Sequence, residues 1–143
     1  MSGFLLDTNV LSEFNRRGQP DRWSNSGWKH PTSALFTRVS SRWEKYDGVE
    51  LLPPSKRRTQ LEQWLDRDLP EWFEGRILTV DQPIADRWGL LRAEAQMNGR
   101  PLSVVDGLLA ATAVQHSLTI VSRNVSDFAA VELAVFNPWE NRV

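Results

Sequence analysis

The stretch Gly3-Phe4-Leu5-Leu6-Asp7 decides the fold, because it has the pattern of a short apolar strand that ends in an acid. A second acid, Asp106, lies within the apolar stretch Ser103-Val104-Val105-Asp106-Gly107-Leu108-Leu109. A third, Asp127, follows the apolar run at residues 118–121. A carboxylate is seldom tolerated beside core-forming sequence unless it is paired or coordinates an ion. We therefore predict that the three acids converge at one edge of a sheet and form a metal site.

Strands and helices alternate along the chain, which is the pattern of a parallel sheet covered by helices. Apolar runs predict strands at residues 3–6, 77–80 and 119–121, with a last run at 134–136. Apolar residues at helical spacing predict helices through Val10, Leu11 and Phe14, from Ser55 to near Pro70, from about Pro83 to Met97, and from Ser103 to about His116. We expect an α/β fold whose ligand site lies outside the carboxyl ends of the strands.

Length and composition fit one domain over residues 1–143, since 41% of the 143 residues are apolar. The absence of cysteine excludes disulfides and a thiolate zinc site. Because we find no secretion-signal pattern and no apolar stretch that could span a membrane, we expect a cytoplasmic protein. The net charge of -1 argues against broad affinity for nucleic acid. The basic run Lys56-Arg57-Arg58 could still guide a phosphate chain, although a solvated helix start explains it better.

Each acid also has a purely structural interpretation. Asp106 lies three residues after Ser103, so it could complete a capping box at the start of a helix. Asp127 could be a turn residue, and Asp7 could accept hydrogen bonds from backbone amides beyond its strand. All three interpretations would have to hold at a single sheet edge, and this coincidence favours a shared site.

Several motifs together resemble the PIN-domain ribonucleases, and among them the VapC toxins of type II toxin-antitoxin systems. The first is Phe4-Leu5-Leu6-Asp7-Thr8-Asn9-Val10-Leu11-Ser12-Glu13. The second is Gly99-Arg100-Pro101-Leu102, which leads to Asp106-Gly107-Leu108-Leu109-Ala110-Ala111-Thr112-Ala113. The third is Ser122-Arg123-Asn124, which leads to Asp127-Phe128, and the closing Asn137-Pro138-Trp139-Glu140 is similar to the tail of many VapC chains. The resemblance implies a PIN-like three-layer α/β fold with a central parallel sheet flanked by helices.

The resemblance implies a Mg²⁺-dependent endoribonuclease, with Mn²⁺ as an alternative ion. By this resemblance Asp7 and Asp106 are the principal metal ligands, and Asp127 completes the cluster directly or through water. Thr8 and Asn124 would orient these carboxylates by hydrogen bonding. Magnesium suits a sparse acidic cluster because it takes few carboxylates and keeps several waters. The implied partners are an RNA substrate, a VapB-like antitoxin and a second copy of the chain in a homodimer.

Residues 23–47 depart from the family pattern, which carries a further glutamate ligand in this part of the chain. By position Glu44 falls there, although a solvated surface charge explains it equally well. Codons displaced by one base would give a glutamate from Trp28-Lys29, within a possible amphipathic helix, and a glycine from Trp43-Glu44, within the strand-helix junction that the family carries. We hypothesise that two compensating frame changes, in the gene or in its determination, bracket this segment. As written, the segment would replace a core strand.

Two other functions remain open from the sequence. A catalytically impaired PIN domain could act only as an antitoxin-binding or dimerising module, and antitoxin binding without cleavage would identify it. Asp7 could instead be the covalent nucleophile of a haloacid-dehalogenase-like phosphatase. That family places a second aspartate two residues later, where this chain has Asn9.

Overall fold

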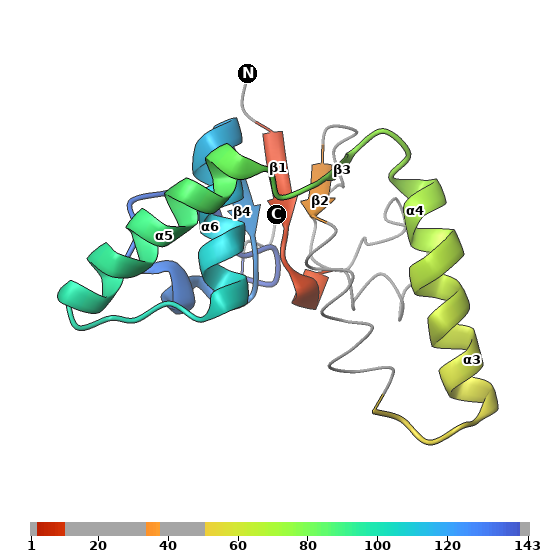
Figure 1. Ribbon diagram of the computed structural model, residues 1–143. Coiled ribbons are helices and arrows are strands. Elements are labelled where there is room, and N and C mark those ends of the chain that lie inside the picture. Colours follow the sequence, from red (N-terminus) through yellow and green to blue (C-terminus); the bar gives the residue numbers. More distant parts are fainter. Residues whose placement is uncertain (1–2, 11–33, 38–50, 141–143) are drawn as a thin grey trace.

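A parallel sheet forms the centre of the protein, which a computed structural model describes over residues 3–10, 34–37 and 51–140 (Figure 1). Within these residues the sheet has five strands in the order β3-β2-β1-β4-β5. Every pair of neighbouring strands is parallel. The strands are β1 (Gly3–Leu6), β2 (Ala34–Thr37), β3 (Ile77–Leu78), β4 (Leu118–Val121) and β5 (Val135–Phe136). The chain adds strands to one side of β1 and then to the other, so the strand order reverses between β1 and β4.

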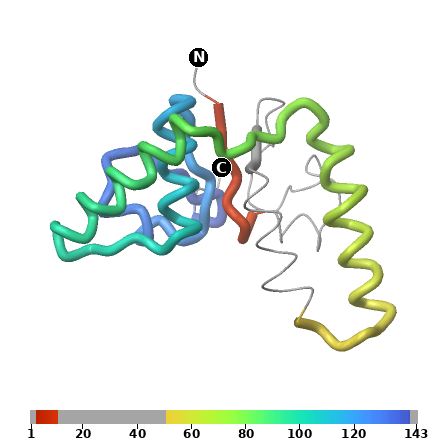
Figure 2. The backbone as a smooth tube through the Cα atoms, in the orientation of Figure 1, coloured from red at the N-terminus to blue at the C-terminus, as the bar shows by residue number. Residues whose placement is uncertain are grey.

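Helical segments cover both faces of the sheet. They are α3 (Lys56–Gln63), the π-helical turn η3 (Trp64–Asp68), α4 (Leu69–Trp72), α5 (Gln82–Met97), α6 (Val104–His116) and the 3-10 turn η4 (Val125–Phe128). Helices α5 and α6 lie side by side on one face, and α3 with α4 lies on the other, as the ribbon and the backbone trace both show (Figures 1 and 2). The three-layer α/β fold predicted from the sequence is confirmed.

Two hydrophobic cores follow from the alternation of side chains along the strands. Leu6 and Val121 pack against the α3 side with Trp64, Leu65 and other buried residues. The neighbouring residues Leu5 and Ile120 point the other way and pack against α6. Trp64 and Leu65 are therefore core residues.

The helical segment that begins after Ser55 ends at Trp72, two residues beyond Pro70, near which the sequence predicts its end. A π-helical turn over Trp64–Asp68 precedes the proline, and the N–H of Leu69 donates to the carbonyl of Trp64, five residues back. Pro70 then occupies the first turn of α4, directly after a π-helical turn whose wider hydrogen-bond spacing accommodates a residue with no N–H to donate. The π-turn thus lets the segment reach Trp72.

Strand β2 corrects one expectation about the atypical segment. Ala34–Thr37 lies within that segment and pairs with both β1 and β3. The chain as written therefore supplies a central strand, because an extended backbone can complete the ladder with almost any non-proline sequence. The rest of residues 23–47, Glu44 included, lies outside the described residues.

The basic run Lys56-Arg57-Arg58 forms the first turn of α3, which agrees with its interpretation as a helix start. Ser55 caps the helix by accepting a hydrogen bond from the N–H of Arg58 at 3.2 Å. The Arg58 side chain pairs with Glu62 at 2.8 Å. In the part of the chain that the structure describes, no helix has the length and apolar character needed to cross a membrane.

Candidate active site

The candidate site lies at the carboxyl ends of β1 and β4, the adjacent strands between which the strand order reverses. In open α/β sheets this reversal leaves a crevice that ligands occupy. Leu6 pairs with Val121 at the last position of the register, so the residues that follow, Asp7 and Ser122, lie side by side at the ends of the two strands. The chain therefore brings residues from its two ends to one point.

Asp7 is the most deeply buried acid of the site, with 4% of its surface exposed. Its backbone N–H extends the ladder by donating to the carbonyl of Val121 at 3.0 Å. The Oδ1 atom accepts from the backbone N–H of Thr8 at 2.7 Å and from the Thr8 hydroxyl at 3.3 Å. The Oδ2 atom accepts from the Ser122 hydroxyl at 2.7 Å. These donors hold the carboxylate in one orientation and offset part of the cost of its burial.

Ser122 is a site residue that the sequence reasoning missed. Its side chain is fully buried, and besides donating to Asp7 its hydroxyl oxygen accepts from the backbone N–H of Asn124 at 3.0 Å. The same oxygen accepts from the side-chain amide of Asn9 at 3.3 Å. The carbonyl oxygen of the Asn9 side chain accepts in turn from the backbone N–H of Arg123 at 3.3 Å. A small polar network thus ties the loop after β4 to the end of β1.

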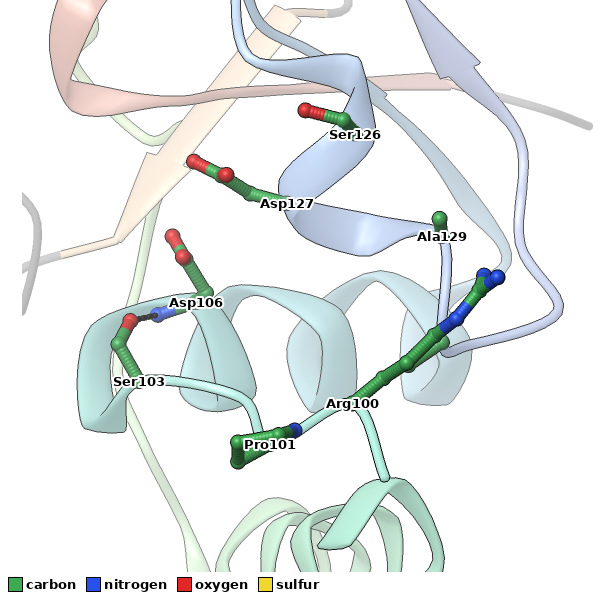
Figure 3. A pocket seen from close by; sticks show the side chains of 8 residues that line it. Arg100, Pro101, Ser103, Asp106, Ser126, Asp127 and Ala129 are labelled. Carbon is green, nitrogen blue, oxygen red and sulfur yellow. Dashed lines mark hydrogen bonds between the residues drawn. The ribbon is translucent and has the colours of Figure 1, made fainter. Parts of the chain in front are cut away.

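Asp106 reaches the site from the first turn of α6. Ser103 caps this helix, and its hydroxyl oxygen accepts from the backbone N–H of Asp106 at 3.1 Å (Figure 3). Burial raises the pKa of Asp106 above its ordinary value of 3.8, and the carboxylates of Asp7 and Asp127 raise it further. A side-chain hydrogen bond with Ser103 acts in the opposite direction. Asp106 therefore lies close enough to Asp7 and to Asp127 for their charges to repel its own.

Asp127 lies on η4, the short 3-10 turn that follows β4. It is exposed, and it lines one pocket of about 570 Å³ together with Asp106. In the close view the two side chains point toward each other across this pocket (Figure 3). The acids thus form a series from the buried Asp7 through the half-buried Asp106 to the exposed Asp127.

The two residues expected to orient the carboxylates are placed differently. Thr8 donates to Asp7 through its N–H and its hydroxyl. Asn124 contributes its backbone N–H to Ser122, which in turn donates to Asp7. The role of Asn124 in orienting Asp7 stays a prediction, because Asn124 contacts Ser122 and only Ser122 of these two donates to Asp7.

A divalent cation fits this set of donors. Within the described residues, no three histidine, cysteine or acidic side chains are grouped closely enough to form a complete ligand set. Magnesium does not need one, since it usually takes one or two carboxylates directly and fills its other positions with water. The facing Asp106 and Asp127, with the fixed carboxylate of Asp7 nearby, supply oxygen ligands and negative charge of the kind that this ion prefers.

The PIN domain family model matches residues 4–133, a range that contains all three acids. This chain belongs to the PIN domain family. It is similar to the toxin FitB of Neisseria gonorrhoeae, with 38% identity over 141 residues that cover 96% of this chain and 99% of FitB. It is 32% identical over 140 residues to the VapC ribonuclease Y4jK of Sinorhizobium fredii, covering 95% of this chain and 97% of that protein. The crystal structure of FitAcB from Neisseria gonorrhoeae matches with a TM-score of 0.79 and 37% identity, covering 96% of this chain and 99% of that chain.

The PIN family assignment confirms the resemblance seen in the sequence motifs. It also agrees with the sheet, because the matched range begins in β1 and continues past η4. The PIN domain therefore contains the whole candidate site, from Asp7 to Asp127.

Proposed function

We propose that this PIN domain is a metal-dependent endoribonuclease and the toxic component of a type II toxin-antitoxin system. The observation that carries the proposal is the approach of Asp7, Asp106 and Asp127 at the carboxyl ends of β1 and β4, where burial, and after it the charges of the other two acids, raise the pKa of Asp106. A divalent cation relieves this repulsion and binds a phosphodiester at the same time. The names of the relatives, a toxin and a ribonuclease, support this function.

In the proposed site Asp7 and Asp106 hold the ion, and Asp127 completes the cluster directly or through water. Ser122 and Thr8 fix the Asp7 carboxylate from both of its oxygens, and Asn124 supports Ser122. Glu44 is a further proposed ligand. The chemistry that Mg²⁺, or Mn²⁺ in its place, supplies is the activation of water for in-line attack and the neutralisation of charge on the phosphodiester.

The proposed reaction needs no nucleophilic side chain. The oxygen of water bonds to phosphorus, the bond to the 3′ oxygen breaks, and that oxygen leaves with a proton. The products carry a 5′-phosphate and a 3′-hydroxyl. A histidine-based ribonuclease would instead use the 2′-hydroxyl as the nucleophile, so the ends of the fragments report which chemistry takes place.

The proposed partners are RNA, a VapB-like antitoxin that covers the acidic site, and a second copy of this chain in a homodimer. We expect this protein to meet its partners in the cytoplasm. We also expect residues 1–143 to form a single PIN domain. Light scattering of the purified protein tests the homodimer.

The test of the function is cleavage of structured RNA by the purified chain with Mg²⁺ or with chelator. We expect metal-dependent fragments with 5′-phosphates, and we expect Asp7→Asn and Asp106→Asn to lose at least a hundredfold of the rate. Asp86→Asn on the exposed surface of α5 makes the same charge change and should leave the rate unchanged.

The absence of RNA cleavage by the folded chain, with every divalent metal tested, would overturn the proposal that it is a nuclease. If that chain still binds an antitoxin, the alternative of a binding-only PIN domain replaces it. An aspartyl-phosphate trapped on Asp7 would instead favour the phosphatase.

A further inference from the structure

The pocket that holds Asp106 and Asp127 continues beyond the acids. Small side chains also line it, namely Ser126, Ala129 and Ala130, and so does Arg100. Its volume of about 570 Å³ is within the range of sites that bind small organic groups. Space for part of a substrate is therefore available directly beside the candidate metal site.

The backbone of Arg100 is fixed by the end of α5. The N–H of Arg100 donates to the carbonyl of Ala95 at 2.9 Å, and the N–H of Gly99 donates to that of Gln96 at 3.1 Å. With Gly99 at a φ of +72°, these two bonds form a Schellman motif. The Arg92 side chain also donates to the carbonyl of Leu102 at 3.4 Å, on the far side of the loop. The base of the Arg100 side chain is thus set at the pocket rim.

The Arg100 side chain points away from the acids. In Figure 3 it runs toward Ala129, at the end of the pocket opposite Asp106 and Asp127. It is exposed, and no hydrogen bond or ion pair joins its guanidinium to any residue that the structure describes. Its charge therefore does not neutralise the acids, and it can accept an anion. A guanidinium binds phosphate oxygens with two parallel hydrogen bonds.

We infer that Arg100 binds the phosphate next to the one being cut, and that the pocket holds the nucleotide between the two phosphates. The inference rests on the proposed function, because the acid end must carry the ion that binds the reacting phosphate. The two ends of one pocket then fit two successive phosphates of a single strand. Arg100 is a positioning residue in this scheme, since it fixes the strand and does not touch the reacting atoms.

Binding of a fluorescent single-stranded RNA in chelator, over a series of salt concentrations, tests the contact without cleavage. One lost phosphate contact lowers the slope of log affinity against log salt by about 0.7 for a single strand. We expect this change in Arg100→Ala. The matched control is Arg67→Ala, which removes the same charge from the exposed surface of η3, on the opposite face of the sheet, and should leave the slope unchanged (Figure 1).

Steady-state cleavage in Mg²⁺ provides the second measurement. Arg100→Ala should raise KM by about tenfold, which is the loss of one charge-assisted contact, with little change in kcat. Arg100→Lys should keep the salt slope because it keeps the charge. An unchanged slope and an unchanged KM in Arg100→Ala overturn the inference.

The failure of this inference is distinct from the failure of the proposed function. If the wild-type chain cuts RNA and Arg100→Ala behaves like Arg67→Ala, only the phosphate contact is wrong. If the wild-type chain cuts no RNA but its salt slope still depends on Arg100, the contact is real and the nuclease is wrong. Loss of antitoxin binding in Arg100→Ala, with RNA binding intact, would assign the pocket to the antitoxin and overturn the inference.

Discussion

Ser122 and Asp7 lie 115 residues apart in the chain, and the serine hydroxyl donates to the Asp7 carboxylate at 2.7 Å inside the protein. This bond joins the ends of two neighbouring strands, and it orients the acid on which the proposed site depends. The serine thus connects the topology of the sheet to the chemistry of the site.

We predict that Ser122→Ala weakens metal binding by about 10- to 100-fold, because the partners that orient metal ligands have effects of this size. It should also lower the free energy of unfolding by roughly 1–3 kcal/mol, since it leaves a buried carboxylate oxygen without its donor. Calorimetric titration with Mn²⁺ and thermal melting measure the two effects. Ser122→Thr keeps the hydroxyl and should keep most of the affinity. Equal affinities in Ser122→Ala and the wild type would contradict the role.

Much of this site could be predicted from the sequence, and Ser122 shows why the rest could not. The acids stand out because carboxylates are rare beside apolar runs. Ser103 is likewise recognised from a local pattern, because it lies three residues before Asp106 at the start of a helix. A serine after a strand is ordinary. Its importance depends on the register that places Leu6 beside Val121, which no local pattern contains.

The helices and strands also divide into those that local sequence predicts and those that depend on contacts between distant residues. The expected boundaries of α5, α6 and β4 differ from the structure by about one residue, because caps and apolar spacing mark them. The π-turn that carries the helix past Pro70 contains Trp64 and Leu65, which pack in the core, and the local sequence does not predict it. Strand β2 likewise gains its place from its two neighbours, and its own sequence pattern does not predict it.

Gly107 is predicted to be required where α5 touches α6, next to Asp106. A Cβ at this position would lie 2.9 Å from Cδ1 of Trp88, so either the Trp88 side chain or one of the two helices would have to shift. We expect Gly107→Ala to lower Tm by about 3–6 °C, because overpacking costs more than the helix propensity gains. Cleavage should fall with it, as Asp106 moves. Melting curves and the cleavage assay measure both effects.

The matched control for Gly107→Ala is Gly89→Ala on α5. A Cβ at Gly89 meets no atom within 4 Å, so the same substitution should raise Tm by about 2 °C through the unfolded state. If both variants gain stability, the close approach of Trp88 does not limit the packing.

The stability of the metal-free protein should depend on Asp106 and pH. The folded state raises the pKa of Asp106 above 3.8, so folding takes up a proton between that value and the raised one. Stability from this group therefore falls as pH rises through the window, and Asp106→Asn should be more stable than the wild type at neutral pH. The gain is small because the side chain is only half-buried. Urea unfolding in chelator at pH 7 and pH 4 measures the difference in the free energy of unfolding between Asp106→Asn and the wild type. A difference that is larger at pH 4 than at pH 7 would contradict the prediction.

The frame hypothesis predicts the coding DNA of residues 23–47. The displaced frame should contain no stop codon, and it should encode a Gly-Glu pair beside position 44. Sequencing the gene with its flanks tests this directly. A stop codon in the displaced frame would refute it and would leave the segment as a true feature of this protein.

Binding of Mn²⁺, followed by its paramagnetic resonance signal, tests most directly whether the three acids form one metal site. We predict that the wild-type chain binds the ion and that Asp7→Asn and Asp106→Asn each weaken binding at least tenfold, whereas Asp86→Asn does not. Equal Mn²⁺ affinity in the wild type and both site variants would show that the acids hold no metal, and it would contradict the account.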